Sequence, residues 1–138
     1  MAATRTPDRF RFTDFTLDRL ANGRCRARVV LALPDDTPFT GEAEALGSPA
    51  GELRCAGEAC VAALTRAIRH TVKFELLGVK AVRAFDANVV IVSLAIADDP
   101  QSKRLVGCYL TEEEPARGAA LAVLNATNRV LGNRFFMR

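Results

Sequence analysis

The stretch FRFTDFTL (residues 10–17) has a counterpart 64 residues later in FELLGVKA (residues 74–81). The two stretches carry matching apolar residues at Phe10 and Phe74, Phe12 and Leu76, Phe15 and Val79, and Leu17 and Ala81. Each stretch leads into a turn sequence, a second apolar segment, a third segment and an alanine-rich helix. Internal repetition has to be weighed before single elements, because each repeat folds as one unit that packs on its neighbour. The chain is therefore expected to fold as two similar halves.

The alternation of apolar and polar residues predicts six strands, and a period of three to four residues predicts two helices. The expected strands span residues 9–20, 25–33, 39–46, 73–83, 89–97 and 104–111. The expected helices span residues 52–71 and, after a capping box of Thr111 and Glu114, the segment that Gly132 closes. Hairpin turns are expected at Asn22-Gly23 and at residues 86–88, where residue types accept positive φ angles.

Two further features are shared by the halves. A change of phase near Asp14 and a glycine at position 78 each predict a β-bulge in the first strand of a half. Gly107 in the sixth strand stands near the place that Gly41 holds in the third. The many alanines give both helices slim apolar faces that can approach a sheet closely.

The order βββα-βββα predicts an α+β fold, with an antiparallel sheet covered by two helices in a two-layer arrangement. The 138 residues make one domain, with halves at about 9–71 and 72–134, a disordered lead-in at 1–8 and an apolar tail at 135–138. Residues 89–97 are apolar on both faces, so this strand is expected to be central or to lie in a dimer interface.

The composition is 49% hydrophobic and 25% charged, which is typical of a soluble globular protein. The longest apolar stretch, residues 87–97, is far shorter than the roughly 20 residues of a membrane helix. The N-terminus lacks the apolar core of a signal peptide, so we expect a cytoplasmic protein. The cysteines at positions 25, 55, 60 and 108 lack the spacing of a zinc or redox site, and we expect them to be reduced and mostly buried.

Catalytic patterns are missing from the sequence. The single histidine, His70, stands at a predicted helix end, where it can satisfy the last carbonyl groups. Acidic residues cluster at 35–36, 98–99 and 112–114, which are turns or a helix start, where acids are structurally favoured. A general acid needs a desolvated carboxyl group, which exposed turns do not supply. The sequence therefore predicts no catalytic residue, no metal site, no cofactor and no enzymatic activity.

The second helix carries the more unusual residues. Asn125, Asn128 and Arg129 are three or four positions apart and so share one side of it. Two asparagines inside a helix are unusual, because asparagine is a modest helix former. They could bind a small ligand, bond across a subunit interface, or be solvated surface. Arg104 and Tyr109, in the preceding strand segment, are weaker candidates of the same kind.

The stretch Leu105-Val106-Gly107, followed by Thr111-Glu112 and by residues 119–128, resembles the last strand and helix of the C-terminal regulatory domain of 2-isopropylmalate synthase. That domain, like its relative in citramalate synthase, consists of two βββα units, dimerises and binds the feedback amino acid near the interface. On this comparison Asn128 matches the closing asparagine. Residues 53–59 depart from the family's Gly-rich, Pro-containing turn, and the catalytic barrel is absent. The resemblance implies a fold and dimerisation, not the amino-acid site.

The leading interpretation is a non-enzymatic homodimeric module that binds a small metabolite or a protein partner, without contact to a membrane. The two-sided apolar strand and the tail at 135–138 favour a dimer, because exposed apolar patches tend to associate. The alternative is nucleic-acid binding through Arg26 and Arg28, which share one face of the second strand and could neutralise phosphates. The scarcity of exposed aromatic residues speaks against stacking on single strands.

Overall fold

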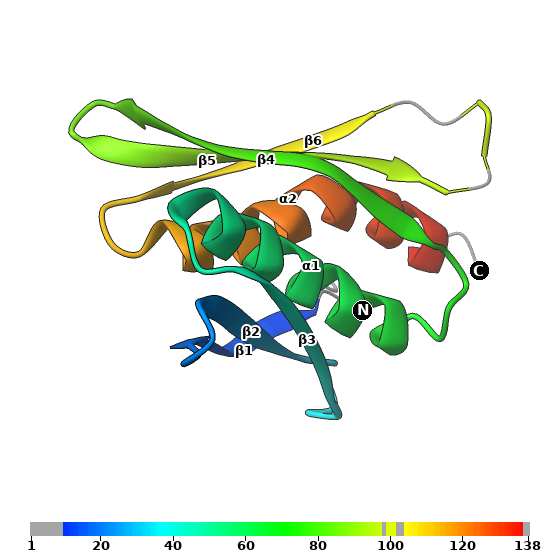
Figure 1. Ribbon diagram of the computed structural model, residues 1–138. Coiled ribbons are helices and arrows are strands. Elements are labelled where there is room, and N and C mark those ends of the chain that lie inside the picture. Colours follow the sequence, from blue (N-terminus) through cyan, green and yellow to red (C-terminus); the bar gives the residue numbers. More distant parts are fainter. Residues whose placement is uncertain (1–9, 98, 102–103, 137–138) are drawn as a thin grey trace.

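The computed structural model describes residues 10–97, 99–101 and 104–136, and the side chains of all these except Arg129 and residues 132–136 (Figure 1). The first half consists of β1 (Arg11–Arg19), β2 (Arg24–Ala32), β3 (Pro38–Leu46) and α1 (Pro49–Ala67). The second half consists of β4 (Phe74–Ala84), β5 (Ala87–Ile96), β6 (Leu105–Thr111) and α2 (Pro115–Phe136). The α+β class and the βββα-βββα repeat are confirmed.

The described strands form two separate antiparallel sheets, not a single shared one. Sheet A has the order β1-β2-β3 and sheet B the order β4-β5-β6. The two helices lie beside each other between the sheets (Figure 1), with α1 against β2 and β3 and α2 against β5 and β6. Each half thus has the expected two layers of sheet and helix. Because both helices face inward, the whole molecule has three layers.

The predicted β-bulges occur at equivalent places in the two halves. The register with the neighbouring strand shifts between Phe12 and Asp14 in β1, and between Leu76 and Gly78 in β4. The residues skipped by these shifts, at positions 13 and 77, are 64 positions apart, which is the offset of the repeat. A bulge adds local twist and bends the strand. The first strand of each half therefore bends at the same point.

A glycine in the third strand of each half lets the covering helix lie directly on the sheet. A Cβ atom at Gly41 would be 2.2 Å from the Ala59 carbonyl oxygen and 2.2 Å from the Ala63 nitrogen. A Cβ atom at Gly107 would be 2.4 Å from the Ala122 carbonyl oxygen. No side chain fits into these gaps, so the backbones of α1 and α2 rest on β3 and β6.

The core fills the space between the layers with small helical residues and larger residues from the inner sheet faces. The largest side chains with essentially no exposure are Val29, Leu31, Leu64, Val90, Val92, Leu94, Val123 and Thr127. Thr127 satisfies its hydroxyl group by donating to the Val123 carbonyl oxygen at 3.0 Å. Burial of each leucine or valine contributes about 1.5–3 kcal/mol. Among the described residues, no helix combines the length and the apolar character needed to cross a membrane.

Helix α1 begins three residues before the predicted start at position 52. The Ser48 Oγ atom accepts a hydrogen bond from the Gly51 amide at 3.0 Å, which satisfies one amide of the first turn. Pro49 takes the first helical position, where its missing N–H group costs nothing. The residue types at 47–51 are typical of a loop, but in the structure they contain the cap and the start of the helix.

The end of α1 lies at Ala67, before the predicted end near position 71. Arg69 and His70 both adopt left-handed backbone conformations, with φ angles of 56° and 60°. The His70 amide donates to the Thr65 carbonyl oxygen at 3.0 Å, which closes the helix. His70 therefore contributes to the helix end through its backbone amide, and the predicted role of its ring stays a prediction.

Helix α2 departs from the prediction at both ends. The Thr111 Oγ atom accepts from the Glu113 amide at 3.0 Å and does not cap the helix, because Thr111 is held in β6 opposite Asn88. The helix also runs through Gly132 to Phe136, so the predicted closure at Gly132 is wrong. Residues 135 and 136 of the predicted tail belong to α2, whereas residues 137–138 and the predicted lead-in at 1–8 lie outside the described residues.

Both hairpin turns differ from the prediction, the first in which residues have positive φ angles and the second in its position. Between β1 and β2, Gly23 takes a φ angle of 79°, whereas Asn22 has no positive φ angle and instead accepts from the Arg24 amide at 3.1 Å. This matches a three-residue loop closed by a left-handed glycine. Between β4 and β5, the turn is formed by Phe85 and Asp86, one position earlier than predicted.

The close contact of helix and sheet predicts that Gly41→Ala destabilises the protein by about 3 kcal/mol or more, because the new methyl group meets helix backbone that cannot move aside. Gly78→Ala is the matched control, since a Cβ atom at Gly78 would meet no neighbouring group within 4 Å. We expect it to change stability by about 0.5 kcal/mol or less. Urea unfolding curves measure both, and equal losses would contradict the contact.

Candidate interaction surface

Paired charges cover the outer face of sheet A, the face turned away from the helices. Arg26 of β2 lies opposite Glu44 of β3 and donates to its Oε2 atom through Nε at 3.1 Å and Nη2 at 2.7 Å. Arg28 lies 3.5 Å from an Asp14 oxygen and 3.9 Å from a Glu42 oxygen. The hydrogen bond from Arg26 lowers the pKa of Glu44 below its ordinary value. This face is therefore a charged and solvated surface.

The structure brings Arg26 and Arg28 together, as the nucleic-acid alternative requires, but it matches their charges with acids. Arg24, Arg26 and Arg28 share the face with Asp14, Asp18, Glu42 and Glu44. Phosphate binding is driven by unmatched positive charge that displaces counterions. A phosphate would have to break these pairs first, so the geometry does not favour a nucleic-acid surface here.

The outer face of sheet B is apolar. The inner residues of β5, Val90 and Val92 among them, are fully buried against the helices, so the residues between them point outward. The outward positions of the three strands hold Val82, Val89, Ile91, Val106, Cys108 and Leu110, which we call the apolar face. Ile91 is 37% exposed, Val106 54% and Leu110 58%. Strand β5 is thus apolar on both sides, as predicted, although the helices cover only one of them.

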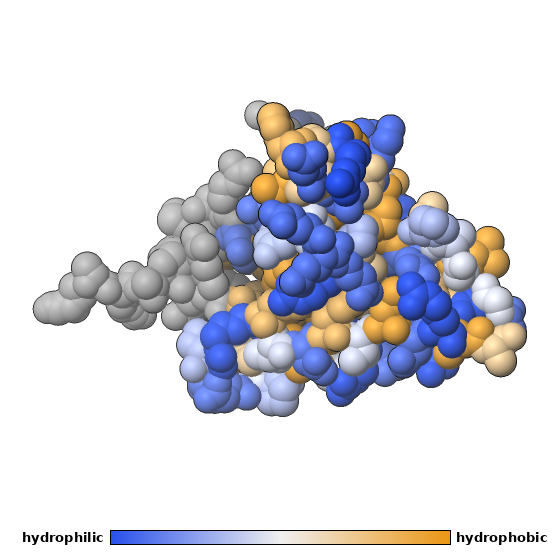
Figure 2. Space-filling model, turned by 90° about the vertical axis from the view of Figure 1, so that its left-hand side faces the viewer, coloured by the Kyte–Doolittle hydropathy of each residue, from blue (hydrophilic) through white to orange (hydrophobic). Residues whose placement is uncertain are grey.

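An exposed phenylalanine stands at the tip of the β4–β5 hairpin, next to the apolar face. Phe85 is 95% exposed, and its φ angle is 53°. Two-residue hairpin turns favour Asn-Gly because both residues need positive φ, and a bulky residue there is strained. Figure 1 shows that this turn extends beyond the helices, and in Figure 2, which views this end, hydrophobic residues lie among hydrophilic ones over sheet B. Phe85 is therefore a bulky, exposed residue at a turn position that suits asparagine or glycine better.

Sequence reasoning missed Phe85 because it placed the turn at residues 86–88. The pairing of Ala84 with Ala87 leaves Phe85 and Asp86 as the two turn residues. An available signal was a large aromatic residue directly before an aspartate, between two runs of strand-forming residues. Such a residue is unusual in a two-residue turn.

Asn125 has a defined partner in the structure. Its Oδ1 atom accepts a hydrogen bond of 3.3 Å from the Cys108 amide on β6. Strand β6 is an edge strand with only β5 beside it. An asparagine inside a helix is thereby explained, because its side chain satisfies an amide that no neighbouring strand can reach.

The other candidate residues of the second half lie around the same edge. Tyr109 belongs to β6 and is 37% exposed, whereas Asn128 lies on α2 and is half-buried. Arg104 is exposed and precedes the first residue of β6. The side chain of Arg129 is among those that the structure does not describe. A shared ligand-binding role for these residues stays a prediction.

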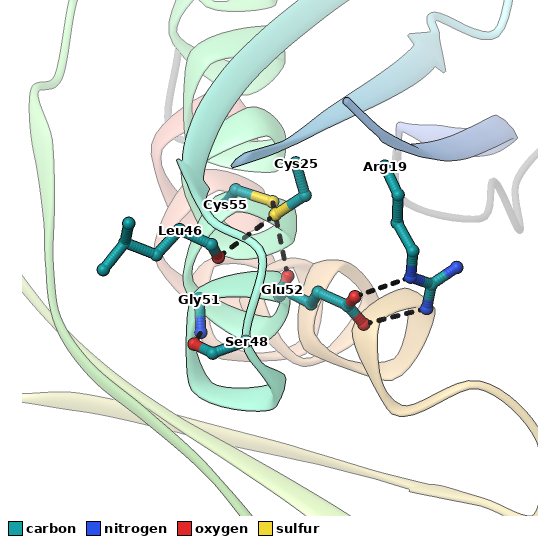
Figure 3. A network of polar contacts seen from close by, with 7 residues as sticks. All are labelled: Arg19, Cys25, Leu46, Ser48, Gly51, Glu52 and Cys55. Atoms are coloured by element: carbon teal, nitrogen blue, oxygen red, sulfur yellow. Dashed lines mark hydrogen bonds and ion pairs between the residues drawn. The ribbon is translucent and has the colours of Figure 1, made fainter. Parts of the chain in front are cut away.

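Two buried thiols meet beneath the start of α1 (Figure 3). The Cys25 Sγ atom lies 3.4 Å from the Cys55 Sγ atom and 3.4 Å from the Leu46 carbonyl oxygen. Burial, followed by the hydrogen bond with Cys25, raises the pKa of Cys55 to about 12. Burial also raises the pKa of Cys60. Because the thiolate is the reactive form, this burial disfavours Cys55 and Cys60 as nucleophiles, and both pack as small hydrophobic residues.

The ion pair beside these thiols ties sheet A to the helix (Figure 3). Arg19 at the end of β1 donates to the Glu52 carboxylate through Nε at 2.9 Å and Nη2 at 3.2 Å. Two parallel hydrogen bonds fix the relative orientation of an arginine and a carboxylate. This acid therefore has a structural partner in the first turn of α1.

The acidic residues in the turns also have structural partners. Asp35 accepts a 3.0 Å hydrogen bond from the Thr37 amide, and its hydrogen bonds with Thr37 lower the pKa of Asp35. Asp99 accepts from the Gln101 amide at 3.0 Å. Asp98 lies outside the described residues. Within the part of the chain that the structure describes, no group of three or more His, Cys, Asp or Glu residues could hold a metal ion.

No known protein family matches this chain, and no curated protein matches it significantly. The resemblance to the regulatory domain of 2-isopropylmalate synthase therefore stays a prediction.

The lowered pKa of Glu44 predicts a pH-dependent effect of Glu44→Gln on the free energy of unfolding. A carboxyl group whose pKa is lower in the folded state adds stability above its unfolded pKa, and loses it as the pH falls through the folded value. We expect the variant to be less stable than wild type at about pH 7 and equally stable near about pH 2. Urea unfolding at both pH values tests this, and a difference that persists in acid would contradict the ion-pair explanation.

The thiol environments predict selective labelling by a thiol reagent at neutral pH. Cys108 is exposed, whereas Cys25, Cys55 and Cys60 are buried. In dilute native protein we expect Cys108 to react rapidly and the three buried thiols to react only after unfolding. Mass spectrometry of labelled peptides identifies the sites. Labelling of Cys55 as fast as that of Cys108 would show that the thiol pair is accessible.

Proposed function

We propose that the protein is a non-enzymatic, homodimeric binding module of the cytoplasm, which recognises a small metabolite or a protein partner. The observation that carries this proposal is the contrast between the outer faces of two similarly built sheets. Sheet A presents matched charges such as Arg26 and Glu44, and sheet B presents the apolar face. Since both halves have the same architecture, the fold alone does not require an apolar exterior.

An exposed apolar face on one sheet favours association with another apolar surface. Monomeric proteins seldom expose contiguous apolar patches larger than a few hundred Å² without a partner. Sheet A shows how the same strand pattern is made compatible with water, through cross-strand pairs of arginine and glutamate. Sheet B carries valine, isoleucine and leucine at the equivalent outward positions. Such a surface gains free energy when a second apolar surface removes it from water.

Other positions support the remaining parts of the proposal. The acids in turns, Asp35 and Asp99, are engaged by backbone amides, and burial suppresses the thiolate of Cys55. These groups serve the fold and leave no activated acid, base or nucleophile among themselves.

The proposal predicts that the purified protein contains two subunits at micromolar concentrations. Sedimentation velocity measures the mass in solution, and native mass spectrometry of protein purified from its source reports subunit number and any retained small molecule together. We expect a dimer, with added mass if a metabolite remains bound. A ligand-free monomer at all accessible concentrations would overturn the proposal.

A further inference from the structure

We propose that the apolar face is covered by the same face of a second copy of this chain, packed sheet on sheet, and that Phe85 anchors the contact. This inference rests on the proposed function, because it names the surface and the partner of the dimer. A two-fold axis makes such an interface from one surface patch used twice. Packed sheets approach to about 10 Å, with the side chains of the two faces interlocked.

The size of the surface makes Phe85 necessary. Three strands of 11, 10 and 7 residues, about 4.8 Å apart and with about 3.3 Å per residue, outline a face of about 450 Å². Two such faces bury about 900 Å², which is below the range of a specific interface. A phenylalanine side chain can bury about 150–250 Å². With one Phe85 ring from each copy, the contact reaches the range of about 1,200–2,000 Å² that stable complexes show.

The charges on sheet B suit a self-complementary contact. At the outward positions of the central strand β5 stand Val89, Ile91, Ser93 and Ala95, which carry no charge. Glu75 and Lys80, on the edge strand β4, are the outward titratable residues opposite β5. A contact centred on β5 therefore desolvates no charge at its middle. The two charges of opposite sign stay at its margin, where interfaces are normally polar.

One backbone group on each free edge of sheet B is bonded to a helix side chain, which favours the face over strand addition. On β6, Asn125 accepts from the Cys108 amide at 3.3 Å. On β4, the Arg54 Nη2 atom donates to the Leu76 carbonyl oxygen at 2.9 Å, next to the bulge. A strand added at either edge would have to displace one of these hydrogen bonds. Packing on the apolar face displaces neither.

Phe85 has the properties of an interface anchor. Its backbone is fixed in a two-residue turn between the paired residues Ala84 and Ala87. The turn backbone is thus already ordered, so burial of the ring costs only the freedom of its two side-chain torsions. Aromatic residues supply much of the binding energy of protein interfaces. A glycine or asparagine would suit the φ angle of 53° better, so the phenylalanine carries a conformational cost at this position.

The experiment compares dimer dissociation constants by sedimentation for the full chain and three variants. Phe85→Asn relieves the strained turn and removes the ring, so at concentrations below the Kd, where both proteins are monomers, we expect an unchanged or higher Tm. We expect its Kd to be raised about 30-fold or more. Ile91→Glu places a carboxylate opposite Lys80 within one subunit, which the monomer tolerates and an apolar contact does not. We expect it to raise the Kd at least as much. Leu46→Ala, at a 66% exposed leucine on the outer face of sheet A, is the matched control and should leave the Kd unchanged.

Cys108 offers a second readout that needs no substitution, because it lies on the apolar face. We expect its labelling rate to fall as the wild-type concentration rises through the Kd. A rate independent of concentration in a protein that does dimerise would overturn this face as the interface. Protection of Cys108 in step with dimer formation supports it.

The outcomes separate this inference from the proposed function. A wild-type monomer overturns both, and leaves the face to a different occupant. A wild-type dimer whose Kd none of the variants changes overturns the apolar face and leaves the homodimer standing. A dimer weakened by Ile91→Glu but not by Phe85→Asn overturns the anchor role. Weakening by both, with Leu46→Ala unchanged, supports the whole inference.

Discussion

The structure depends on the direct contact between a helix backbone and a strand backbone, made once in each half. At Gly41 and Gly107 the strand has no side chain, and helical backbone atoms occupy the place where a Cβ atom would stand. The alanines of α1 and α2 keep the helices slim on their other sides as well, so both helices fit into one layer between two sheets. A larger residue in either strand would push the helix away and open the core. The repeated glycine therefore sets the thickness of the whole molecule.

Placing both helices inside has a consequence for the surfaces. Each sheet buries one face in the core. Its other face is exposed and can be charged or apolar without a change of fold. Sheet A carries cross-strand pairs such as Arg26 with Glu44, which are exposed and screened and so add little to stability. Sheet B carries the apolar face, with Phe85 beside it in a strained turn. We propose that both halves use the same packing of helix on sheet, while the outer face of sheet A stays solvated and the outer face of sheet B associates.

Several features could be read from the sequence because they depend on local pattern. The bulges near Asp14 and Gly78 follow from a break in alternation and from a glycine. Gly41 and Gly107 stand at similar places in the third strand of each half, although they are 66 positions apart and not 64. Features that depend on the competition between neighbouring elements were misjudged. Thr111 has the chemistry of a helix cap, but its pairing with Asn88 keeps it in β6. Phe85 has no turn propensity, and strand register alone places it in the turn.

The candidate surface also combines features that the sequence predicts with features that only the tertiary structure shows. The sequence shows that Asn125 is an unusual residue inside a helix. Only the packing of α2 along β6 shows that its partner is the Cys108 amide. The sequence by itself determined the order of elements, the equivalence of the halves and the two apolar sides of β5, because alternation and period are local properties of the chain. Tertiary structure alone decided that the sheets stay separate, that the helices cover only one side of β5, and that Phe85 stands exposed beside the other. Those outcomes depend on how the halves pack together, and packing between residues distant in sequence leaves no periodic signal.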